Sequence, residues 1–526
     1  MPTNLKINLN ISILSASLCC LLIGGCKKDL LEMDNPTAVK YENFYKTEAD
    51  AIQSINAAYQ PLEQMYQTWM PYTEMSRSDE EKTNNNASGH NDVVKTCDFT
   101  TTASNNVVNE LWQVYYRGIY RANLVLERVP AIEFRDAARK DRVLGEARFL
   151  RAFYLYQLVT HFGEEVPLPL TGAASEEDYK VAPAETGKVW EQIITDLKEA
   201  QEALPIVDTY RGKEDLGRAS KGAATGLLGK VYLRRKEYQP AANELDKIIG
   251  KKVGAYGLTA SYKDNFSDAT ENNIESVFEV QYHFDIALRS AGNYGSQRAQ
   301  SHGMNNKANG NRWWNAFATK AIHDEFESGD PRKFMTLWCE GGANFDNRGK
   351  ILDFKAQQWS TYGTGVFGWR KYEYDDNWQA RSGQIYDGNN FRYLRYADVL
   401  LMYAECVIEG ATGPVTAEAT INEVRKRANN VVPAEQTQLF YSKQAAKLPM
   451  VEELMKAKGW NLRTALRHER MVELAGELVR WEDIVRWDIG PSVIKEPAFS
   501  APKSYLFPIP QRELDTNPNA KPNVAN

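Results

Sequence analysis

The histidines and cysteines are the side chains that could bind a metal ion or form disulfide bonds, and their spacing favours neither. No two histidines fall at metal-binding helical spacing, so we interpret each as a surface residue or a hydrogen-bonded core residue. Cys97, Cys339 and Cys406 lie far apart and form no C-x-x-C motif. We therefore expect no metal, no other cofactor and no disulfide framework. The histidines are His90, His161, His283, His302, His323 and His468.

The known catalytic motifs give little support for an enzyme. Residues 363–368 match G-x-G-x-x-G, but no hydrophobic strand precedes them and no clear helix follows, so a dinucleotide site is not expected. The sequence contains no G-x-S-x-G, Walker or H-E-x-x-H motif. A glycosidase needs only two carboxylates across a sugar cleft, so the acidic clusters 79–81 and 375–376 leave that class open. We interpret both clusters as solvated surface and name no catalytic residue.

The amino-terminal segment has the features of a bacterial lipoprotein signal. Residues 11–23 are apolar or small, and this stretch is too short to span a bilayer as a helix. The small residues at 24–25 directly before Cys26 resemble a lipobox. We predict that Cys26 is lipidated, because several acyl chains anchor a protein stably without a spanning helix. The alternative is that Cys19, Cys20 and Cys26 are merely apolar residues of a signal peptide.

Composition and charge exclude several classes of protein. The chain has 526 residues, with 63 Lys plus Arg against 69 Asp plus Glu, so it has no strong positive field to hold nucleic-acid phosphates. Apolar residues make up 43% and charged residues 25%, which argues against a disordered chain and against a multi-span membrane protein. The length allows either one large domain or several domains of about 150 residues.

Apolar residues recur at three- and four-residue spacing in four long segments, which predicts helices. The segment 142–162 is apolar around most of its circumference and should lie inside the fold. Arg148 and Arg151 share one face of it, so we expect acidic partners on neighbouring helices. Gly163 suits a left-handed cap. The other helices are expected over 49–62, 107–129 and 190–204, and the last of these could pair with 142–162.

Two segments, 221–250 and 396–428, have residue spacings of the tetratricopeptide pattern. In the first, Leu228, Gly229 and Tyr232 fall at the positions where two antiparallel helices approach closely. In the second, Ala404 is the small residue of the first helix, and the turn is one residue longer than the ideal. Three or four helix pairs are enough to stack into a stable array. We therefore predict a mainly α fold built on a tetratricopeptide-like helical-repeat scaffold.

A long segment between these units, 254–391, is rich in Gly, Asn, Trp and Tyr and has little periodicity. Residues 277–281 alternate like a short strand. We predict a loop-rich insert that carries the ligand site, since long loops in compact proteins are usually functional. The expected organisation is a signal peptide at 1–25, a lipidated tether at 26–40, and one unit over 41–526 with a helical part at 41–253, the insert at 254–391 and a second helical part at 392–526.

Several sequence blocks, in the expected order, resemble the SusD/RagB family of outer-membrane nutrient-binding lipoproteins of the Bacteroidetes. The longest blocks are GEARFLRAFY at 145–154 and RYADVLLMYAE at 395–405. The resemblance covers nearly the whole mature chain. Further blocks lie at 217–221, 422–428, 469–477, 505–510 and 517–519.

The resemblance implies a non-catalytic lipoprotein of the outer membrane, facing outward, that captures oligosaccharides and delivers them to a SusC-like TonB-dependent transporter. Some members of the family take peptides, so oligopeptide capture is an alternative, and a surface glycoside hydrolase is a weaker third hypothesis. The charged residues of the blocks are expected to join helices through ion pairs rather than to perform chemistry. They are Arg395, Asp398, Glu405, Arg470, Glu473, Glu477, Arg480 and Asp483.

The composition of two segments fits sugar binding. A neutral sugar has an apolar C–H face and a rim of hydroxyls, so its site needs exposed aromatic rings beside polar side chains. Such residues occur over 69–86 and again over 313–378. The alternative for the aromatic residues is core packing or contact with the transporter, because large aromatic side chains usually become buried. The predicted ligand-binding residues are Trp69, Tyr72, Arg77, Asp79, Trp313, Trp314, Trp359 and Tyr362.

Some residues of the helical segments are expected to serve the fold alone. Gly222 and Gly226 replace better helix formers in the first repeat, and each is expected to lower its local stability by up to about 1 kcal/mol. Four tryptophans in helical patterns are expected in the core. They are Trp112, Trp190, Trp481 and Trp487.

Overall fold

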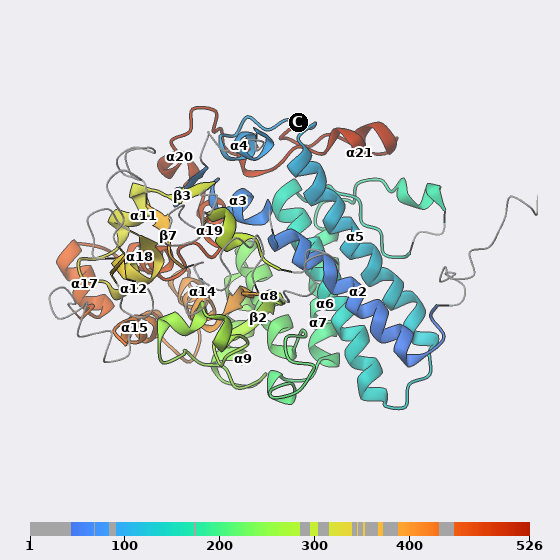
Figure 1. The fold of residues 1–526 in the computed structure, drawn as a ribbon, viewed down its shortest axis with the longest axis horizontal. Coiled ribbons are helices and arrows are strands. Elements are labelled where there is room, and N and C mark those ends of the chain that lie inside the picture. The colour runs from blue at the N-terminus through green and yellow to red at the C-terminus, as the bar shows by residue number, and fades with distance from the viewer. Residues whose placement is uncertain are drawn as a thin grey trace, which may run out of the picture.

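The computed structural model describes a mainly helical protein, as predicted (Figure 1). None of the helices within the described ranges is long and apolar enough to cross a membrane. The described residues are 44–67, 69–83, 91–172, 175–283, 295–302, 315–338, 344–345, 351–352, 367–371, 388–430 and 447–526. The helices are α2 (Glu48–Gln67), α3 (Trp69–Met75), α4 (Asn91–Cys97), α5 (Asn106–Arg128), α6 (Ala137–Phe162), α7 (Lys188–Ala203), α8 (Lys221–Arg234), α9 (Tyr238–Ile249), α10 (Arg298–His302), α11 (Lys320–Glu325), α12 (Pro331–Thr336), α14 (Tyr396–Ile408), α15 (Ala417–Ala428), α17 (Val451–Lys458), α18 (Leu462–Glu473), α19 (Arg480–Trp487), α20 (Gly490–Val493) and α21 (Gln511–Thr516).

Consecutive helices stack into an array, which confirms the predicted helical pairs (Figure 1). Helix α6 packs between α5 and α7, and α8 packs between α7 and α9. The hairpin α8–α9 is the predicted first repeat, and α14–α15 is the second. Although the insert separates the two hairpins in the sequence, α14 packs directly against α9. The array therefore continues across the insert.

The strands are short and pair antiparallel in twos. The predicted strand at 277–281 is confirmed as β2 (Ser276–Val280), and it pairs with β8 (Phe391–Arg395). Because these strands lie near the two ends of the predicted insert, their pairing brings those ends together. The other pairs are β1 (Glu81–Thr83) with β3 (Ala316–Ala318), β4 (Leu337–Trp338) with β7 (Gly368–Trp369), and β5 (Asn344–Phe345) with β6 (Ile351–Leu352).

Helix α2 continues through Pro61 and ends at Gln67. A proline inside a helix has no N–H to donate to the carbonyl four residues earlier. That carbonyl belongs to Ala57, and Arg121 of α5 donates to it at 2.8 Å. The neighbouring helix thus satisfies the acceptor that Pro61 leaves open.

Helix α6 is the buried helix that the sequence predicted, and it starts at Ala137, where Asp136 caps it by accepting a hydrogen bond from the Ala138 N–H at 3.0 Å. The expected acidic partners are confirmed on α7: Arg148 pairs with Glu199, and Arg151 pairs with Asp196 at 2.6 Å. The predicted left-handed cap at Gly163 is wrong in detail. Its φ is +92°, but its ψ of 178° is extended.

The predicted core tryptophans are buried in three of four cases. Trp112, Trp190 and Trp481 are at most 5% exposed. Trp487, the last residue of α19, is only partly buried. Its indole N–H donates to Glu405 at 2.9 Å.

The two glycines of α8 have a packing role that helix propensity alone does not capture. A Cβ at Gly222 would lie 2.1 Å from the Tyr256 hydroxyl, and one at Gly226 would lie 2.4 Å from Leu394 Cδ2. These positions therefore let β8 and the segment after α9 approach the helix closely. The interpretation of the glycines as merely weaker helix formers is incomplete.

We predict that Gly226→Ala destabilises the protein by roughly 1–3 kcal/mol, because the new methyl group overpacks against Leu394. Urea unfolding measures the change in the free energy of unfolding. Gly257→Ala is the control, since a Cβ there comes no closer than 4.0 Å to another side chain. A Gly226→Ala protein that is more stable than wild type, as helix propensity alone predicts, would contradict the packing role.

Candidate functional site

Tyr72, a predicted ligand residue on α3, is packed inside the protein. It is 2% exposed, and its ring stacks on that of His302 with centroids 4.7 Å apart. Its hydroxyl accepts a hydrogen bond from the Asn315 side chain at 3.1 Å. This position agrees with core packing, the alternative that was weighed against ligand contact.

Arg77, another predicted ligand residue, is also buried. Its guanidinium lies 4.3 Å from the ring centre of Trp481 and 4.1 Å from that of Phe507. It donates to the Ser504 carbonyl at 2.6 Å. Burial lowers the pKa of Arg77 to about 10. These contacts attach the turn after α3 to the carboxy-terminal segment.

Asp79 and the two carboxylates after it are not the solvated surface that the sequence predicted. Asp79 receives two hydrogen bonds of 2.7 Å from Arg480. Glu80 accepts from the Gly476 N–H, and burial raises the pKa of Glu80 to about 8. Glu81 is 0% exposed. The interpretation was wrong because these residues pack against segments far along the chain. The cluster at 375–376 lies outside the described residues.

The remaining predicted site residues lie outside the described part of the chain. The structure describes the backbone of Trp69 at the start of α3, and its side chain is outside the description. Residues 363–366 of the glycine pattern lie wholly outside the described residues. The structure thus gives Tyr72, Arg77 and Asp79 separate packing partners, and ligand contact by the others stays a prediction. The residues wholly outside the described ranges are Trp313, Trp314, Trp359, Tyr362 and the lipidation site Cys26.

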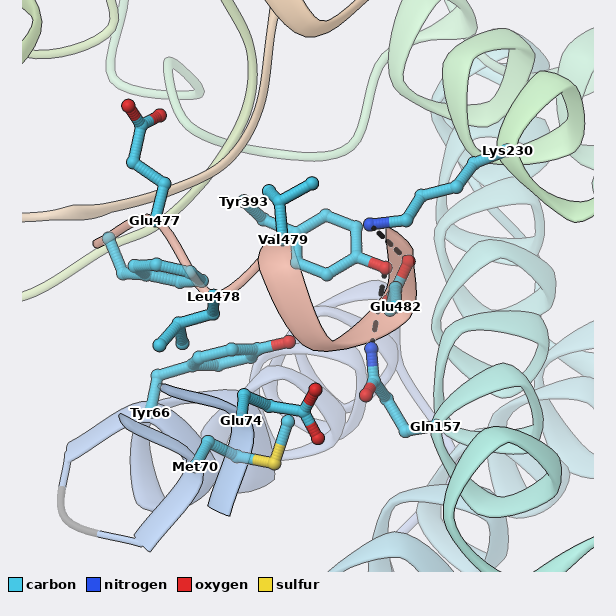
Figure 2. Close-up of a pocket in the computed structure, with 11 residues that line it drawn as sticks. Tyr66, Met70, Glu74, Gln157, Lys230, Tyr393, Glu477, Leu478, Val479 and Glu482 are labelled. Atoms are coloured by element: carbon cyan, nitrogen blue, oxygen red, sulfur yellow. Dashed lines mark hydrogen bonds and ion pairs between the residues drawn. The ribbon is translucent and has the colours of Figure 1, made fainter. Parts of the chain in front are cut away.

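An internal pocket lies between α3, α6, α8, β8 and α19 (Figure 2). Lys230 and Glu482 form an ion pair at 3.0 Å on one side of it, and Gln157 donates to the Tyr393 hydroxyl at 3.3 Å. The pocket has room for about one water molecule. It is therefore too small for a sugar ring. Its lining residues are Tyr66, Met70, Glu74, Gln157, Lys230, Phe391, Tyr393, Glu477, Leu478, Val479 and Glu482.

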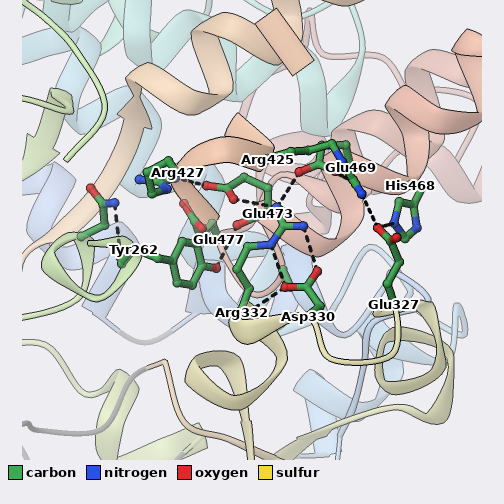
Figure 3. A network of polar contacts seen from close by, with 12 residues as sticks. Tyr262, Glu327, Asp330, Arg332, Arg425, Arg427, His468, Glu469, Glu473 and Glu477 are labelled. Atoms are coloured by element: carbon green, nitrogen blue, oxygen red, sulfur yellow. Dashed lines mark hydrogen bonds and ion pairs between the residues drawn. The ribbon is translucent and has the colours of Figure 1, made fainter. Parts of the chain in front are cut away.

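A buried cluster of charges surrounds Glu473 at the end of α18 (Figure 3). Arg395 contacts Glu473 at 2.7 Å, and Arg332 of α12 contacts it at 2.9 Å. Arg427 of α15 also pairs with it. Burial alone would raise the pKa of Glu473, but the three guanidinium groups hold it at about 2. We call these residues and their partners Glu275, Glu469 and Glu477 the Glu473 cluster.

The cluster joins parts of the chain that are far apart in sequence. Arg395, directly before α14, also contacts Glu275 at 2.8 Å and Glu477 at 2.6 Å. Arg332 also contacts Glu469 at 2.5 Å. The insert, the second repeat and α18 therefore meet in one buried network. All eight charged residues of the blocks form ion pairs, as predicted. Some of these pairs join a helix to another kind of segment, because Arg395 lies in β8 and Glu477 follows α18.

A second set of buried ion pairs links α14, α18 and α19. Arg470 contacts Asp483 at 2.7 Å and Asp398 at 2.9 Å. Arg486 contacts Glu405 at 2.7 Å. The helices of the carboxy-terminal part are thus fixed to the second repeat by the same kind of contact.

Sequence reasoning missed the residues of the insert that take part in these networks. Lys371, directly after β7, is buried and donates to Glu477 at 2.7 Å and to the Ala475 carbonyl at 2.8 Å. Burial lowers the pKa of Lys371 to about 8 despite the carboxylate beside it. Arg332 and Glu275 have partners more than a hundred residues away, so no local spacing could reveal them.

His468 of α18 forms a similar contact at the edge of the cluster. Its two ring nitrogens lie 2.8 Å from Glu325 and 3.3 Å from Glu327. Burial would lower its pKa, but the hydrogen bonds that its ring donates to these carboxylates raise it to about 9. Within the described ranges, no group of three or more His, Cys, Asp or Glu side chains could hold a metal ion.

Two family models match this chain, and together they span residues 30–498. A family model described as "SusD family" matches residues 231–498, and one described as "Starch-binding associating with outer membrane" matches residues 30–233. SusD-like protein P2 of Formosa agariphila is 28% identical over 520 residues, which cover 96% of this chain and 97% of that protein.

Solved structures have the same fold. A SusD superfamily protein from Bacteroides vulgatus superposes with a TM-score of 0.71 at 27% identity, covering 91% of this chain and 99% of that one. Surface glycan-binding protein A from Bacteroides thetaiotaomicron, in complex with laminarihexaose, has a TM-score of 0.71 over 91% of this chain and 100% of that one. At 20% identity, this second likeness concerns the fold alone.

We predict that Glu473→Gln destabilises the protein by roughly 3–5 kcal/mol, because it leaves buried arginines with too little negative charge. Glu409→Gln is the matched control, since Glu409 pairs with a half-exposed Arg463 and should cost less than about 1 kcal/mol. Urea unfolding at pH 7 gives both values. Equal costs for the two variants would show that the cluster does not hold the fold.

Proposed function

Because this chain belongs to the SusD family, we propose that it is a cell-surface lipoprotein that captures oligosaccharides without cleaving them and delivers them to a SusC-like TonB-dependent transporter. The observation that carries the proposal is the match to two SusD family models, which together span residues 30–498. The family description "Starch-binding associating with outer membrane" supports the same ligand class and location.

The networks of the scaffold support a binding role rather than a catalytic one. A glycosidase needs two carboxylates that face a sugar cleft. Asp79 is paired with Arg480, and Glu80 and Glu81 are buried. The carboxylates of the Glu473 cluster are likewise neutralised by arginines. These acidic groups hold elements together, so we assign none of them a catalytic role.

We assign ligand contact to the aromatic side chains that the sequence singled out in the insert and at the start of α3. Flat rings stack on the apolar face of a pyranose, and nearby polar groups bond its hydroxyls. Tyr72, Arg77 and Asp79 act indirectly in this proposal, because their buried contacts hold α3 and the following turn in place. The proposed contacts are Trp69, Trp313, Trp314, Trp359 and Tyr362.

We predict that a panel of purified oligosaccharides, laminarihexaose included, contains at least one ligand that raises the melting temperature, since a ligand of the native state stabilises it. Trp313→Ala and Trp69→Ala should each weaken that ligand at least about tenfold in calorimetry, the equivalent of about 1.4 kcal/mol of lost stacking. Tyr179→Ala, which removes an aromatic ring that is 62% exposed, is the control.

The outcomes of this panel separate the hypotheses. Stabilisation by peptides and by no glycan would favour the oligopeptide alternative. Cleavage products of an oligosaccharide would contradict the non-catalytic role. Unchanged glycan affinity in both tryptophan variants would reject the proposed contacts while leaving glycan capture intact.

We predict that Cys26→Ser moves the protein from the membrane fraction to the soluble fraction and abolishes labelling by a radioactive fatty acid, because no acyl chain can then attach. Cys20→Ser, in the signal segment, should leave both unchanged. A pull-down of the wild-type lipoprotein from detergent-solubilised outer membranes should contain a TonB-dependent transporter. Membrane retention of Cys26→Ser would contradict the lipid anchor, and a pull-down without a transporter would contradict the delivery role.

A further inference from the structure

Glu80 is a buried carboxyl group at the point where the insert attaches to the rest of the fold. It directly precedes β1, and its backbone carbonyl accepts a hydrogen bond from the Thr319 N–H, directly after β3 of the insert, at 3.0 Å. Its side chain contacts the turn after α18, where Oε2 accepts from the Gly476 N–H at 3.2 Å. Glu80 therefore connects the insert to a turn of the carboxy-terminal part.

This carboxyl group has no cation of its own within the described part of the chain. It is 1% exposed, and its Oε1 has no hydrogen-bond partner among the described residues. Arg480 attracts it, but that guanidinium donates two hydrogen bonds to Asp79 instead. A negative charge at Glu80 would thus be buried with a single backbone N–H to stabilise it.

The surrounding groups make a negative charge at Glu80 still less favourable. Asp79 precedes it and Glu81 follows it, and both repel an anion at this position. The other charged and titratable groups on the elements around it lie beside one another or are neutral, and so supply no free cation. They are Glu74 with Arg77, His302 with Glu81, Glu477 with Arg395 and Lys371, Asp324 with Lys320 and His323, and the neutral thiol of Cys97.

We propose that the Glu80 carboxyl group is neutral in the folded protein at neutral pH, and that its ionisation weakens the attachment of β1 and β3 to the turn at Gly476. Burying a neutral carboxyl group costs much less free energy than burying a carboxylate that has no cation beside it. Burial accordingly raises the pKa of Glu80 to about 8. This inference concerns the docking of the insert and does not depend on the nature of the ligand.

The expected pH dependence follows from the difference between the folded and the unfolded chain. In the unfolded chain, a glutamate titrates near its ordinary pKa of about 4.3. Between that value and about 8, the folded protein holds one proton more than the unfolded chain at Glu80. The contribution of this residue to the folding equilibrium constant therefore falls about tenfold per pH unit. It is complete at low pH and is lost as the pH rises toward the pKa of the folded state.

Urea unfolding of the full mature chain between about pH 5.5 and 7.5 tests the protonation state. Glu80→Gln has nearly the shape of the wild-type side chain and does not titrate. We expect the ratio of its folding equilibrium constant to that of wild type to rise at least about tenfold over this range. The change with pH is the measured quantity, so a constant effect of the new amide hydrogens cancels.

Two further variants make this test decisive. Glu80→Met also lacks a titratable group, so it should show the same rise and replaces Glu80→Gln if that variant does not fold. Glu191→Gln is the control, because the Glu191 side chain is 67% exposed in its surface pair, and it should follow the wild-type profile. A ratio for the Glu80 variants that stays constant or falls with pH would overturn the proposal.

Hydrogen exchange of the β1 and β3 amides tests the consequence for the insert. After correction for the intrinsic effect of pH, exchange in these strands should rise several-fold in wild type as the pH passes the pKa of Glu80, and it should not rise in Glu80→Gln. The amides of α7, in the helical array, are the internal control and should not change. Unchanged exchange in wild type, or a rise that persists in Glu80→Gln, would overturn the role of this carboxyl group.

Discussion

The burial of Glu473 among three arginines sets the conditions under which the rest of this fold can form. Burying one of these charges without a partner costs free energy, and only a charge of opposite sign that is buried with it offsets that cost. Arg332 comes from the insert, Arg395 from the end of β8 and Arg427 from α15. Docking any one of these elements without the others would leave buried charges without a full set of partners. The cluster therefore couples the docking of the insert to the completion of the helical array.

Close approach of the helices is the second requirement, and it explains residues that look unfavourable when each helix is considered alone. Gly226 lets Leu394 of β8 reach α8, and Pro61 inside α2 is tolerated because Arg121 bonds the carbonyl that it leaves open. In both cases, a local cost in helix stability is offset by a contact from another element. Tertiary packing thus decides positions at which intrinsic propensity points the other way.

Periodicity predicted the helices well because each long helix here has a continuous apolar face, as in α5 and α6. The repeat hairpins were predictable since small residues recur at fixed spacing. By contrast, the acidic run after α3 was misjudged: Asp79 forms an ion pair with Arg480, and Glu80 accepts a hydrogen bond from the Gly476 N–H. No local pattern reveals that these partners lie nearby. The same limit applies to Lys371 and Arg332. For the site, composition identified candidate aromatic residues, whereas the burial of Tyr72 required the fold.

The arrangement of charge bears directly on what kind of function the scaffold suits. Acidic groups that act in catalysis usually face a cleft, and their different environments give them different pKa values. Here the carboxylates of the Glu473 cluster face guanidinium groups, and Glu473 keeps its negative charge down to about pH 2. Such groups cannot exchange protons with a substrate at neutral pH, but they hold segments in fixed positions. A rigid frame reduces the entropy lost when a ligand binds, because the loops that contact it begin and end at fixed points. The pairing of β2 with β8 and the Glu473 cluster fix such points in the insert, where we propose ligand contact.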